Sequence, residues 1–318
     1  MKTLTIGLSV VAAAQLLLAG ALWWQDQQQP EASALLALHP KQLTEIKLEH
    51  QGKTLQLVYQ DGAWRLPALQ HEPARPAKVT ALLTELEKAR LQWPVAETTA
   101  SQARFEVAED KYQWKLTLAA GEQQQLIYLG SSPAFKQLYL RRDKETEIYQ
   151  QQISTMDWST EPEQWFDRNL LQISQVNRIK LPQLELEKEA GQWQVRAAQG
   201  ETQIADKALA GQLQQLFSAL QVSGPPVKPL ALKQPEQQLQ VEVQSLSAKH
   251  SYQLQKQQDN YLIKRDDRAV WYPLAAEQAK QLFELEPEKL LAKQSGQSNS
   301  NEKPSASEVQ AEGRSELN

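Results

Sequence analysis

The sequence contains two copies of one pattern, and this internal repeat restricts the fold more than any other feature. The tripeptide Glu161-Pro162-Glu163 returns as Glu286-Pro287-Glu288. Each copy closes a run of strand, turn and helix signals that follow the same order, as expected when one unit has been duplicated. A chain of 318 residues is long enough for two such units. We therefore predict an α+β fold of two tandem modules, each an antiparallel sheet with packed helices.

The first module begins with strands and then forms a helix. Strands are predicted where apolar and polar residues alternate, at residues 46–48, 55–59, 64–66, 114–118, 126–129, 138–141 and 147–150. Asp61-Gly62 predicts a turn into the strand that contains Trp64. Pro76 begins a helix, and Arg168 ends a second helical stretch that closes the module. The first helix has an apolar face made of Val79, Leu82, Leu83 and Leu86.

The second module repeats these elements. Trp193 corresponds to Trp64, and Lys207, at the start of the second helix, corresponds to Lys78. Asp206 precedes this helix and is a candidate N-cap. The apolar face of the helix is made of Leu209, Leu213, Leu216 and Leu220. The remaining matches are Leu239, Val241 and Val243 with Leu116 and its neighbours, Tyr261-Leu262 with Tyr139-Leu140, and Trp271-Tyr272 with Ile148-Tyr149.

The N-terminal segment is long and apolar enough to cross a membrane. Residues 4–24 carry no charge and would span roughly 31 Å as a helix, close to the hydrocarbon core of a bilayer. Lys2 precedes this run, while Trp23-Trp24 and then Asp26 and Glu31 follow it, which predicts a cytoplasmic N-terminus. The alternative is a cleaved secretory signal, because Ala19-Gly20-Ala21 matches the small-x-small cleavage pattern. Both interpretations place residues 30–318 outside the cytoplasm.

Composition divides the chain into five parts. We expect a transmembrane anchor at residues 1–25 and a tether at residues 26–42, with a short helix near Ala34 to Leu38. The fold should begin near Leu43, with the first module at residues 43–168 and the second at residues 169–292. Residues 293–318 are rich in Gln, Ser, Asn, Glu and Lys and are expected to be disordered.

The sequence shows no recognisable set of catalytic, cofactor-binding or metal-binding residues. The net charge is only −4, so nucleic acid is not an expected partner. Cysteine is absent, which excludes thiolate nucleophiles and thiolate metal sites. The segment Gly130-Ser131-Ser132-Pro133 is read as a turn, because it matches neither a phosphate-binding loop nor a nucleophile elbow. The four histidines lack paired spacing and are expected to be solvated; they are His39, His50, His71 and His250.

Carboxylate pairs and aromatic residues also have structural interpretations. Glu109-Asp110 and Asp266-Asp267 fall in predicted turns, where such charges are hydrated. Four aromatic residues occupy inward strand positions and are predicted to pack in the core: Trp64, Trp114, Trp193 and Tyr261. A second group, Trp158, Trp165 and Phe166 beside Asp167 and Arg168, either packs between the modules or forms a docking surface. Gly224-Pro225-Pro226 is either a rigid connector or a polyproline ligand.

These motifs occur in an order that resembles a bacterial family of domains of unknown function. Its members are membrane-anchored proteins often encoded beside gliding-motility-type ABC transporters. The matching pieces are the N-terminal apolar helix, residues 61–66, the helix of Val79 to Leu86, residues 127–130, residues 138–141, Ile148-Tyr149 and residues 165–171. This chain departs from the family at Arg104-Phe105-Glu106-Val107, where many members have a Tyr-Gly-Leu-like turn followed by proline.

The resemblance implies an auxiliary, non-enzymatic component of an envelope ABC transport system. Its expected partners are the lipid bilayer, through the N-terminal helix, and the permease or other envelope proteins. One alternative is a binding module for an envelope polymer or small ligand in the cleft between the modules. An enzyme is a further alternative, and it would require several ionisable groups gathered in one pocket.

Overall fold

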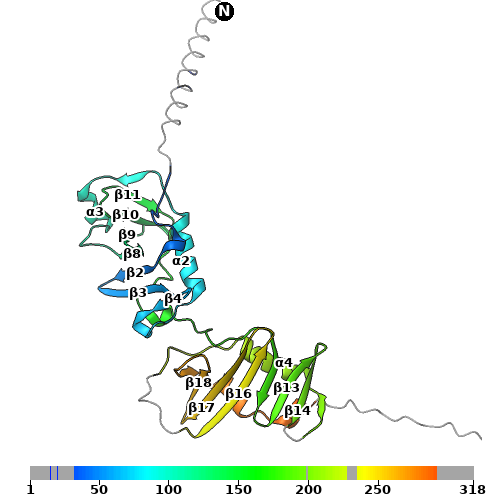
Figure 1. Cartoon of the computed structure of the whole chain (residues 1–318). Helices are drawn as coiled ribbons and strands as arrows, with labels where there is room; N and C mark the ends of the chain where they lie inside the picture. The colour runs from blue at the N-terminus through cyan, green and yellow to red at the C-terminus, as the bar shows by residue number, and fades with distance from the viewer. Residues whose placement is uncertain (1–14, 16–19, 21–31, 198–199, 228–234, 292–318) are drawn as a thin grey trace, which may run out of the picture.

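The computed structural model describes residues 32–197, 200–227 and 235–291, together with Gln15 and Gly20 (Figure 1). The rest of the expected anchor at residues 1–25 and the expected disordered tail at residues 293–318 lie outside this described part. Within it, no helix has the length and apolar character that a bilayer crossing requires. The chain is α+β, because antiparallel sheets carry most of the regular structure and helices pack on them.

The first sheet has nine strands in the order β5-β4-β3-β2-β8-β9-β10-β11-β7. Its neighbouring strands pair antiparallel, with β2 and β8 side by side in the middle. The strands are β2 (Glu45–His50), β3 (Lys53–Gln60), β4 (Ala63–Leu66), β5 (Glu72–Pro73), β7 (Pro94–Ala96), β8 (Trp114–Ala120), β9 (Gln123–Leu129), β10 (Leu138–Arg142) and β11 (Ile148–Gln151). These positions confirm the predicted strands, although Tyr59 at the end of β3 is 45% exposed.

The second sheet has eight strands in the order β15-β14-β13-β12-β16-β17-β18-β19, which repeats the order of the first sheet without β7. The strands are β12 (Val176–Leu181), β13 (Leu184–Glu189), β14 (Gln192–Ala197), β15 (Thr202–Ile204), β16 (Gln237–Ser245), β17 (Lys249–Gln257), β18 (Asn260–Arg265) and β19 (Tyr272–Leu274). The two modules are therefore similar in strand order, as the repeated motifs predicted.

Strand register shows which residues correspond. Trp64 pairs with Tyr59, and Trp193 pairs with Lys188 at the same place in the second sheet. The next turn also matches, because Ala74 N donates to Trp64 O at 2.8 Å and Ala205 N donates to Trp193 O at 2.9 Å. These contacts confirm the predicted match of the two tryptophans.

One predicted match is wrong by a single residue. Leu140 of β10 pairs with Leu129, whereas Ile263 of β18 pairs with Leu254, the residue that corresponds to Leu129. Tyr139-Leu140 is therefore matched by Leu262-Ile263 and not by Tyr261-Leu262. Both strands contain a Tyr-Leu pair, which suggested the wrong match, and only the pairing of strands reveals the shift.

The two long helices bury equivalent faces on their sheets. Helix α2 (Pro76–Lys88) buries Val79, Leu82 and Leu86, and α4 (Lys207–Ser218) buries Ala210, Leu213, Leu216 and Phe217. The side chain of Asp206 accepts hydrogen bonds from Ala208 N at 3.0 Å and Leu209 N at 2.9 Å, which confirms the predicted N-cap. Two shorter helices, α3 (Thr99–Phe105) and α5 (Ala276–Phe283), were not predicted.

The repeated Glu-Pro-Glu tripeptide begins a closing turn in each module. The 3-10 turns η3 (Pro162–Gln164) and η5 (Pro287–Leu290) both have proline in the first position. After η3, Trp165 O accepts a hydrogen bond from Arg75 N at 2.6 Å, and in the second module Leu290 O accepts one from Asp206 N at 2.7 Å. Each closing turn therefore fixes the chain that enters the long helix of its own module. Because Arg75 and Asp206 hold the same place, Lys78 corresponds to Leu209, and its predicted match with Lys207 is wrong by two residues.

The predicted helical stretch toward Arg168 is wrong, because the helical part stops at Gln164. Beyond it, Phe166 forms a β-bridge with Ala74, and Asp167 N donates to Pro73 O at 2.9 Å. These contacts require an extended backbone, so the helix cannot continue.

The segment after the closing turn joins the modules through buried side chains. Trp158, Trp165 and Phe166 are 9%, 1% and 0% exposed, and one apolar core runs through both modules. Packing between the modules holds for Phe166, whose ring stacks on Tyr272, whereas Trp158 meets Trp114 and Trp165 meets Lys78 within the first module. On the side of the second module, Val222 N donates to Arg168 O at 2.9 Å.

A polar contact joins the same junction from two distant edge strands. Glu72 in β5 is buried, and its Oε2 accepts a 2.8 Å hydrogen bond from the Tyr272 hydroxyl of β19. Arg268 Nη1 lies 3.3 Å from the same oxygen, and the ring of Tyr272 stacks on Phe166 with centroids 6.3 Å apart. Burial raises the pKa of Tyr272, and the hydrogen bond to Glu72 raises it further.

The first module also binds the chain that precedes it, through a separate two-stranded sheet. The two-residue strand β1 (Ser33–Ala34) pairs with β6 (Arg90–Leu91), and Leu35 is fully buried. The 3-10 turn η1 (Pro40–Gln42) follows. The expected short helix near Ala34 to Leu38 is therefore absent from this described segment, and ordered packing begins upstream of Leu43.

Candidate functional site

A wide cavity of about 810 Å³ lies along helix α2 in the first module. We call it the α2 groove. One wall is the exposed side of α2, where Ala77 and Ala81 leave space, and the opposite wall is the irregular chain between β11 and η3. The lining residues are Arg75, Ala77, Lys78, Ala81, Leu82, Glu85, Phe135, Lys136, Ser154, Met156, Asp157, Trp158 and Trp165.

Large apolar side chains stand at the mouth of the α2 groove. Phe135 is 76% exposed and Met156 is 75% exposed, although both residue types are usually buried. Trp158 and Trp165 are buried and belong to the core beneath the groove. The groove thus presents two accessible apolar side chains above an aromatic floor.

Three cations line the same groove. Lys78 is half-buried, and its Nζ lies 4.5 Å from the centroid of the Trp165 ring and donates to Gln164 O at 3.4 Å. Burial lowers the pKa of Lys78, the positive charge of Arg75 lowers it further, and Asp157 acts in the opposite direction. Within the described residues, no ion pair involves Arg75, Lys78 or Lys136.

The two carboxylates in the groove, Glu85 and Asp157, offset only part of the charge of the three cations. Glu85 Oε1 accepts a 2.7 Å hydrogen bond from Ser154 N, which fixes the opposite wall to α2. Asp157 is exposed at the rim. The local charge therefore favours an anionic ligand.

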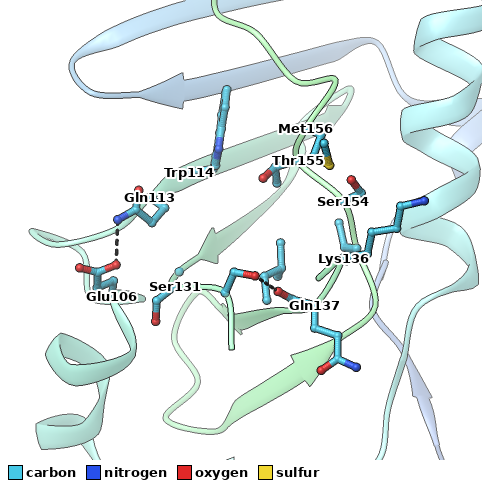
Figure 2. A pocket seen from close by; sticks show the side chains of 13 residues that line it. Glu106, Gln113, Trp114, Ser131, Lys136, Gln137, Ser154, Thr155 and Met156 are labelled. Atoms are coloured by element: carbon cyan, nitrogen blue, oxygen red, sulfur yellow. Dashed lines mark hydrogen bonds between the residues drawn. The ribbon is translucent and has the colours of Figure 1, made fainter. Parts of the chain in front are cut away.

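A smaller cavity of about 340 Å³ adjoins the α2 groove and shares Lys136, Ser154 and Met156 with it. We call it the polar cavity, because its other lining residues include Glu106, Gln113, Ser131, Ser132, Gln137 and Thr155. Figure 2 shows Lys136 extending away from the polar cavity toward the neighbouring helix, while Gln113 bonds to Glu106 at 2.8 Å. The two cavities therefore form one continuous depression with a basic, apolar half and a polar half, in which the Glu106 carboxylate accepts a hydrogen bond from the Gln113 amide.

Close packing at Gly130 shapes the polar cavity. A Cβ atom at this position would lie 2.0 Å from Phe105 O and 2.8 Å from Glu106 O. Only glycine permits this approach between the end of β9 and the end of α3. Glu106, where the sequence departs from the family pattern, adopts the left-handed conformation with φ of 58° and caps α3. The predicted turn at residues 130–133 is wrong, because Gly130 and Ser131 still form backbone hydrogen bonds with Tyr139 and the chain reverses between Ala134 and Gln137.

Aromatic stacking supports the wall between the polar cavity and the core. His50 stacks on Trp114 with ring centroids 4.3 Å apart, and His50 Nδ1 contacts Gln113 O. Trp114 meets Trp158 edge to face at 5.6 Å. Trp114, Trp193 and Tyr261 are buried and Trp64 is half-buried against the core, so their predicted core packing is confirmed.

The second module has a smaller cavity at the equivalent place, with a volume of about 310 Å³. Its lining comes from α4, α5 and η5, and includes Leu209, Leu213, Lys280 and Leu285. Helix α5 takes the position of the irregular chain between β11 and η3, and it buries Ala279 and Leu282. The wide, basic form of the groove therefore belongs to the first module.

The structure brings together one group that the sequence analysis treated as separate residues. His250 Nδ1 lies 2.9 Å from Asp266 Oδ1, and their ligand atoms lie within 4.8 Å of Asp267. Arg265 binds both oxygens of Asp267, at 2.7 and 2.8 Å, and so occupies that carboxylate. Asp266 Oδ2 accepts from Ser251 N at 3.0 Å. This arrangement ties the start of β17 to the turn after β18.

The other predicted positions are scattered. His39 and His71 are exposed, whereas His50 and His250 are half-buried with partners, so the expectation of solvated histidines holds for two of the four. Glu109-Asp110 is exposed in a turn, as predicted. Gly224-Pro225-Pro226 lies between the bridges Val222–Leu274 and Val227–Trp271, which favours a connector.

No motif in the sequence marked the α2 groove. Its walls come from α2, from the loop before β10 and from the connection after β11, which are distant in sequence. The one available signal was Phe135-Lys136, an aromatic and a cation in a polar turn outside any alternating pattern.

Comparison with known proteins gives one match. A family model described as a domain of unknown function, DUF4340, matches residues 64–235, which is more than half of the chain. The chain belongs to the DUF4340 family. All residues of the α2 groove and of the polar cavity fall within this DUF4340 match, whereas β17, β18, β19 and α5 follow it. No curated protein matches the chain, and no solved structure matches it either.

Proposed function

We propose that this DUF4340 protein is a non-catalytic docking scaffold of an ABC-type transport system, anchored in the bacterial inner membrane with its modules in the periplasm. The apolar N-terminal segment supports the anchor, and the resemblance described above supports the transporter. A tether at the membrane raises the local concentration of the modules near a permease, so a weak contact is sufficient for association.

The observation that carries the proposal is the α2 groove. It combines exposed Phe135 and Met156 with three cations that have no ion-pair partner among the described residues. Exposed apolar side chains beside charged groups are typical of protein interaction sites. The groove lies on a body whose two modules share one core, so a partner docked there has a defined position.

The alternative function is the binding of an envelope polymer or small ligand between the modules. That ligand would have to enter the junction where Phe166 and Tyr272 are both fully buried and stacked. The α2 groove is open without any such rearrangement, and we therefore favour protein docking.

Co-purification tests the proposed function. The full-length protein, isolated from detergent-solubilised membranes of its own cells, should bring the ATPase and permease subunits of one transporter with it. A variant with Phe135→Ser and Met156→Ser should recover less of these subunits, because it removes the exposed apolar contacts of the groove. The variant should still fold, since both side chains are exposed and contribute little to stability. Recovery of the protein without transporter subunits would contradict the proposal.

A further inference from the structure

We infer that the α2 groove binds an acidic segment of a partner protein, which runs from the basic half of the groove into the polar cavity. This inference rests on the proposed docking function and specifies the chemistry of its partner. Charge, exposed apolar surface, the character of the adjoining cavity and the comparison with the second module support it independently.

Charge selects an anion for the basic half. Lys78 is held in the wall by its contacts with Trp165 and Gln164, so its ammonium group has already lost part of its hydration. A carboxylate beside a partly desolvated cation gains more than one beside a fully hydrated cation. Arg75 and Lys136 stand at the two sides and extend the positive region along the groove.

Apolar contacts select a ligand larger than a simple anion. Phe135 and Met156 lie on the walls beside Lys136 and Ser154, and both are about three-quarters exposed. A methionine and an aromatic ring adapt to varied side chains, which makes them common in peptide-binding surfaces. An inorganic anion would leave both side chains uncovered.

The polar cavity distinguishes a peptide from a lipid. An acyl chain bound to the basic half would need an apolar continuation, but the groove continues past Ser131, Gln137 and Thr155, beside the buried Leu138 and Ile153. Hydroxyl and amide groups suit the alternating N–H and C=O groups of a peptide backbone. The same depression therefore offers charge contacts at one end and backbone contacts at the other.

The corresponding cavity of the second module lacks two features of the α2 groove. Leu209 of α4 corresponds to Lys78 of α2, and the cavity beside it is about 310 Å³ because α5 lies there. The equivalent place thus lacks both the half-buried lysine and the width. Lys280 lies in this second cavity, is exposed and provides a matched control for changes of charge.

Photo-crosslinking in native membranes tests the inference. The full-length protein carries the photoreactive residue benzoylphenylalanine in place of Phe135, and mass spectrometry identifies the labelled segment after irradiation. We expect a protein segment with net negative charge. Lys136→Glu and Lys78→Glu should each lower the yield about tenfold, as expected when a charge contact becomes repulsive. Lys280→Glu should leave the yield unchanged.

Several outcomes would overturn the inference. They are a labelled lipid, a labelled second copy of this chain, a labelled segment without net negative charge, no adduct, or a yield that Lys136→Glu does not reduce. Lys136 is exposed, so its substitution tests binding even if Lys78→Glu disturbs folding. Co-purified transporter subunits in any of these cases would leave the proposed function standing while the inference about the groove fails.

Discussion

The two modules share their strand order but differ in the connection between the last strand and the closing turn. In the first module this connection is irregular and leaves the α2 groove of about 810 Å³. In the second module it forms α5, and the equivalent cavity is about 310 Å³. The sheets and closing turns are therefore common to both modules, because backbone hydrogen bonds fix their positions. The connection before the closing turn can change its structure without breaking those bonds.

The outer faces of the sheets differ as well. In the first module, Val107, Tyr128 and Ile148 form a small second core, and Arg141 lies over the Tyr128 ring at 4.6 Å. Strand register places Gln253 where Tyr128 is and Trp271 where Ile148 is. The segment with α3 thus covers a surface whose counterpart on β17 carries glutamine.

The largest expected effect concerns the closing turns. Trp165→Ala should destabilise the protein by about 4 kcal/mol, because it empties a buried site and leaves Ser159 O without its 2.8 Å hydrogen bond from the indole. Leu290→Ala, at the corresponding position, should cost about 3 kcal/mol. Urea unfolding followed by circular dichroism measures both. Small effects of both substitutions would show that the closing turns do not stabilise their modules.

The next prediction concerns the close approach that exists only in the first module. Gly130→Ala should destabilise the protein by about 3 kcal/mol, because its Cβ would collide with Phe105 O. Gln255 of β17 corresponds to Gly130 and is only half-buried, so Gln255→Ala is the control and should change stability little. Thermal unfolding compares the variants. A stable Gly130→Ala variant would mean that α3 can move away from β9.

Two corresponding tyrosines test the junction between the modules. Tyr272→Phe should cost about 2 kcal/mol, because it leaves the buried Glu72 carboxylate without its best hydrogen bond. Tyr149→Phe is the matched control, since no hydrogen bond of the Tyr149 hydroxyl is found within the described residues, and it should change the free energy of unfolding little. If both substitutions had the same effect, the Glu72 contact would not stabilise the junction.

The pH dependence of stability sharpens the same comparison. The pKa of Tyr272 is raised by burial and by Glu72, so the folded protein keeps this proton at a pH where the unfolded chain loses it. Its contribution to stability is therefore present at neutral pH and falls as the pH rises above about 10, the pKa of an unperturbed tyrosine. Urea titrations at several alkaline pH values should give a shallower decline for Tyr272→Phe than for the wild type.

The smallest expected effect concerns the two long helices. Gly211 lies in α4 with open space around a Cβ, so Gly211→Ala should stabilise the protein by about 1 kcal/mol. Thr80 occupies the corresponding exposed position of α2, and Thr80→Ala should stabilise by less, because threonine already restricts the unfolded chain. Thermal unfolding midpoints measure both changes, and a lower midpoint for Gly211→Ala would contradict this account.

Local pattern predicted the frame of the fold well, because strands and helices bury alternating or helically spaced apolar residues. The Trp64 and Trp193 match, the Asp206 cap and the strand positions depend on neighbours in sequence. The helix toward Arg168 was predicted wrongly, since bonds to Pro73 and Ala74, far away in sequence, hold that segment extended.

The candidate site and the junction were beyond such patterns. Glu72 and Tyr272 lie in edge strands of different sheets, and their residue types carry no sign that they meet. The α2 groove depends on the space left beside Ala77 and Ala81 when the following connection does not form a helix. Volume and convergence of this kind follow from tertiary packing and not from local periodicity.

The segment that closes the first module has a practical consequence for cutting the protein in two. A fragment that ends at Arg168 would keep Trp165 and Phe166, but it would lose the Tyr272 ring that stacks on Phe166. A fragment that begins at Asn169 would expose the Tyr272 ring, which Phe166 covers in the whole protein. Each half would then expose an aromatic surface that is buried in the whole protein. Separately expressed halves should therefore associate with each other or self-associate.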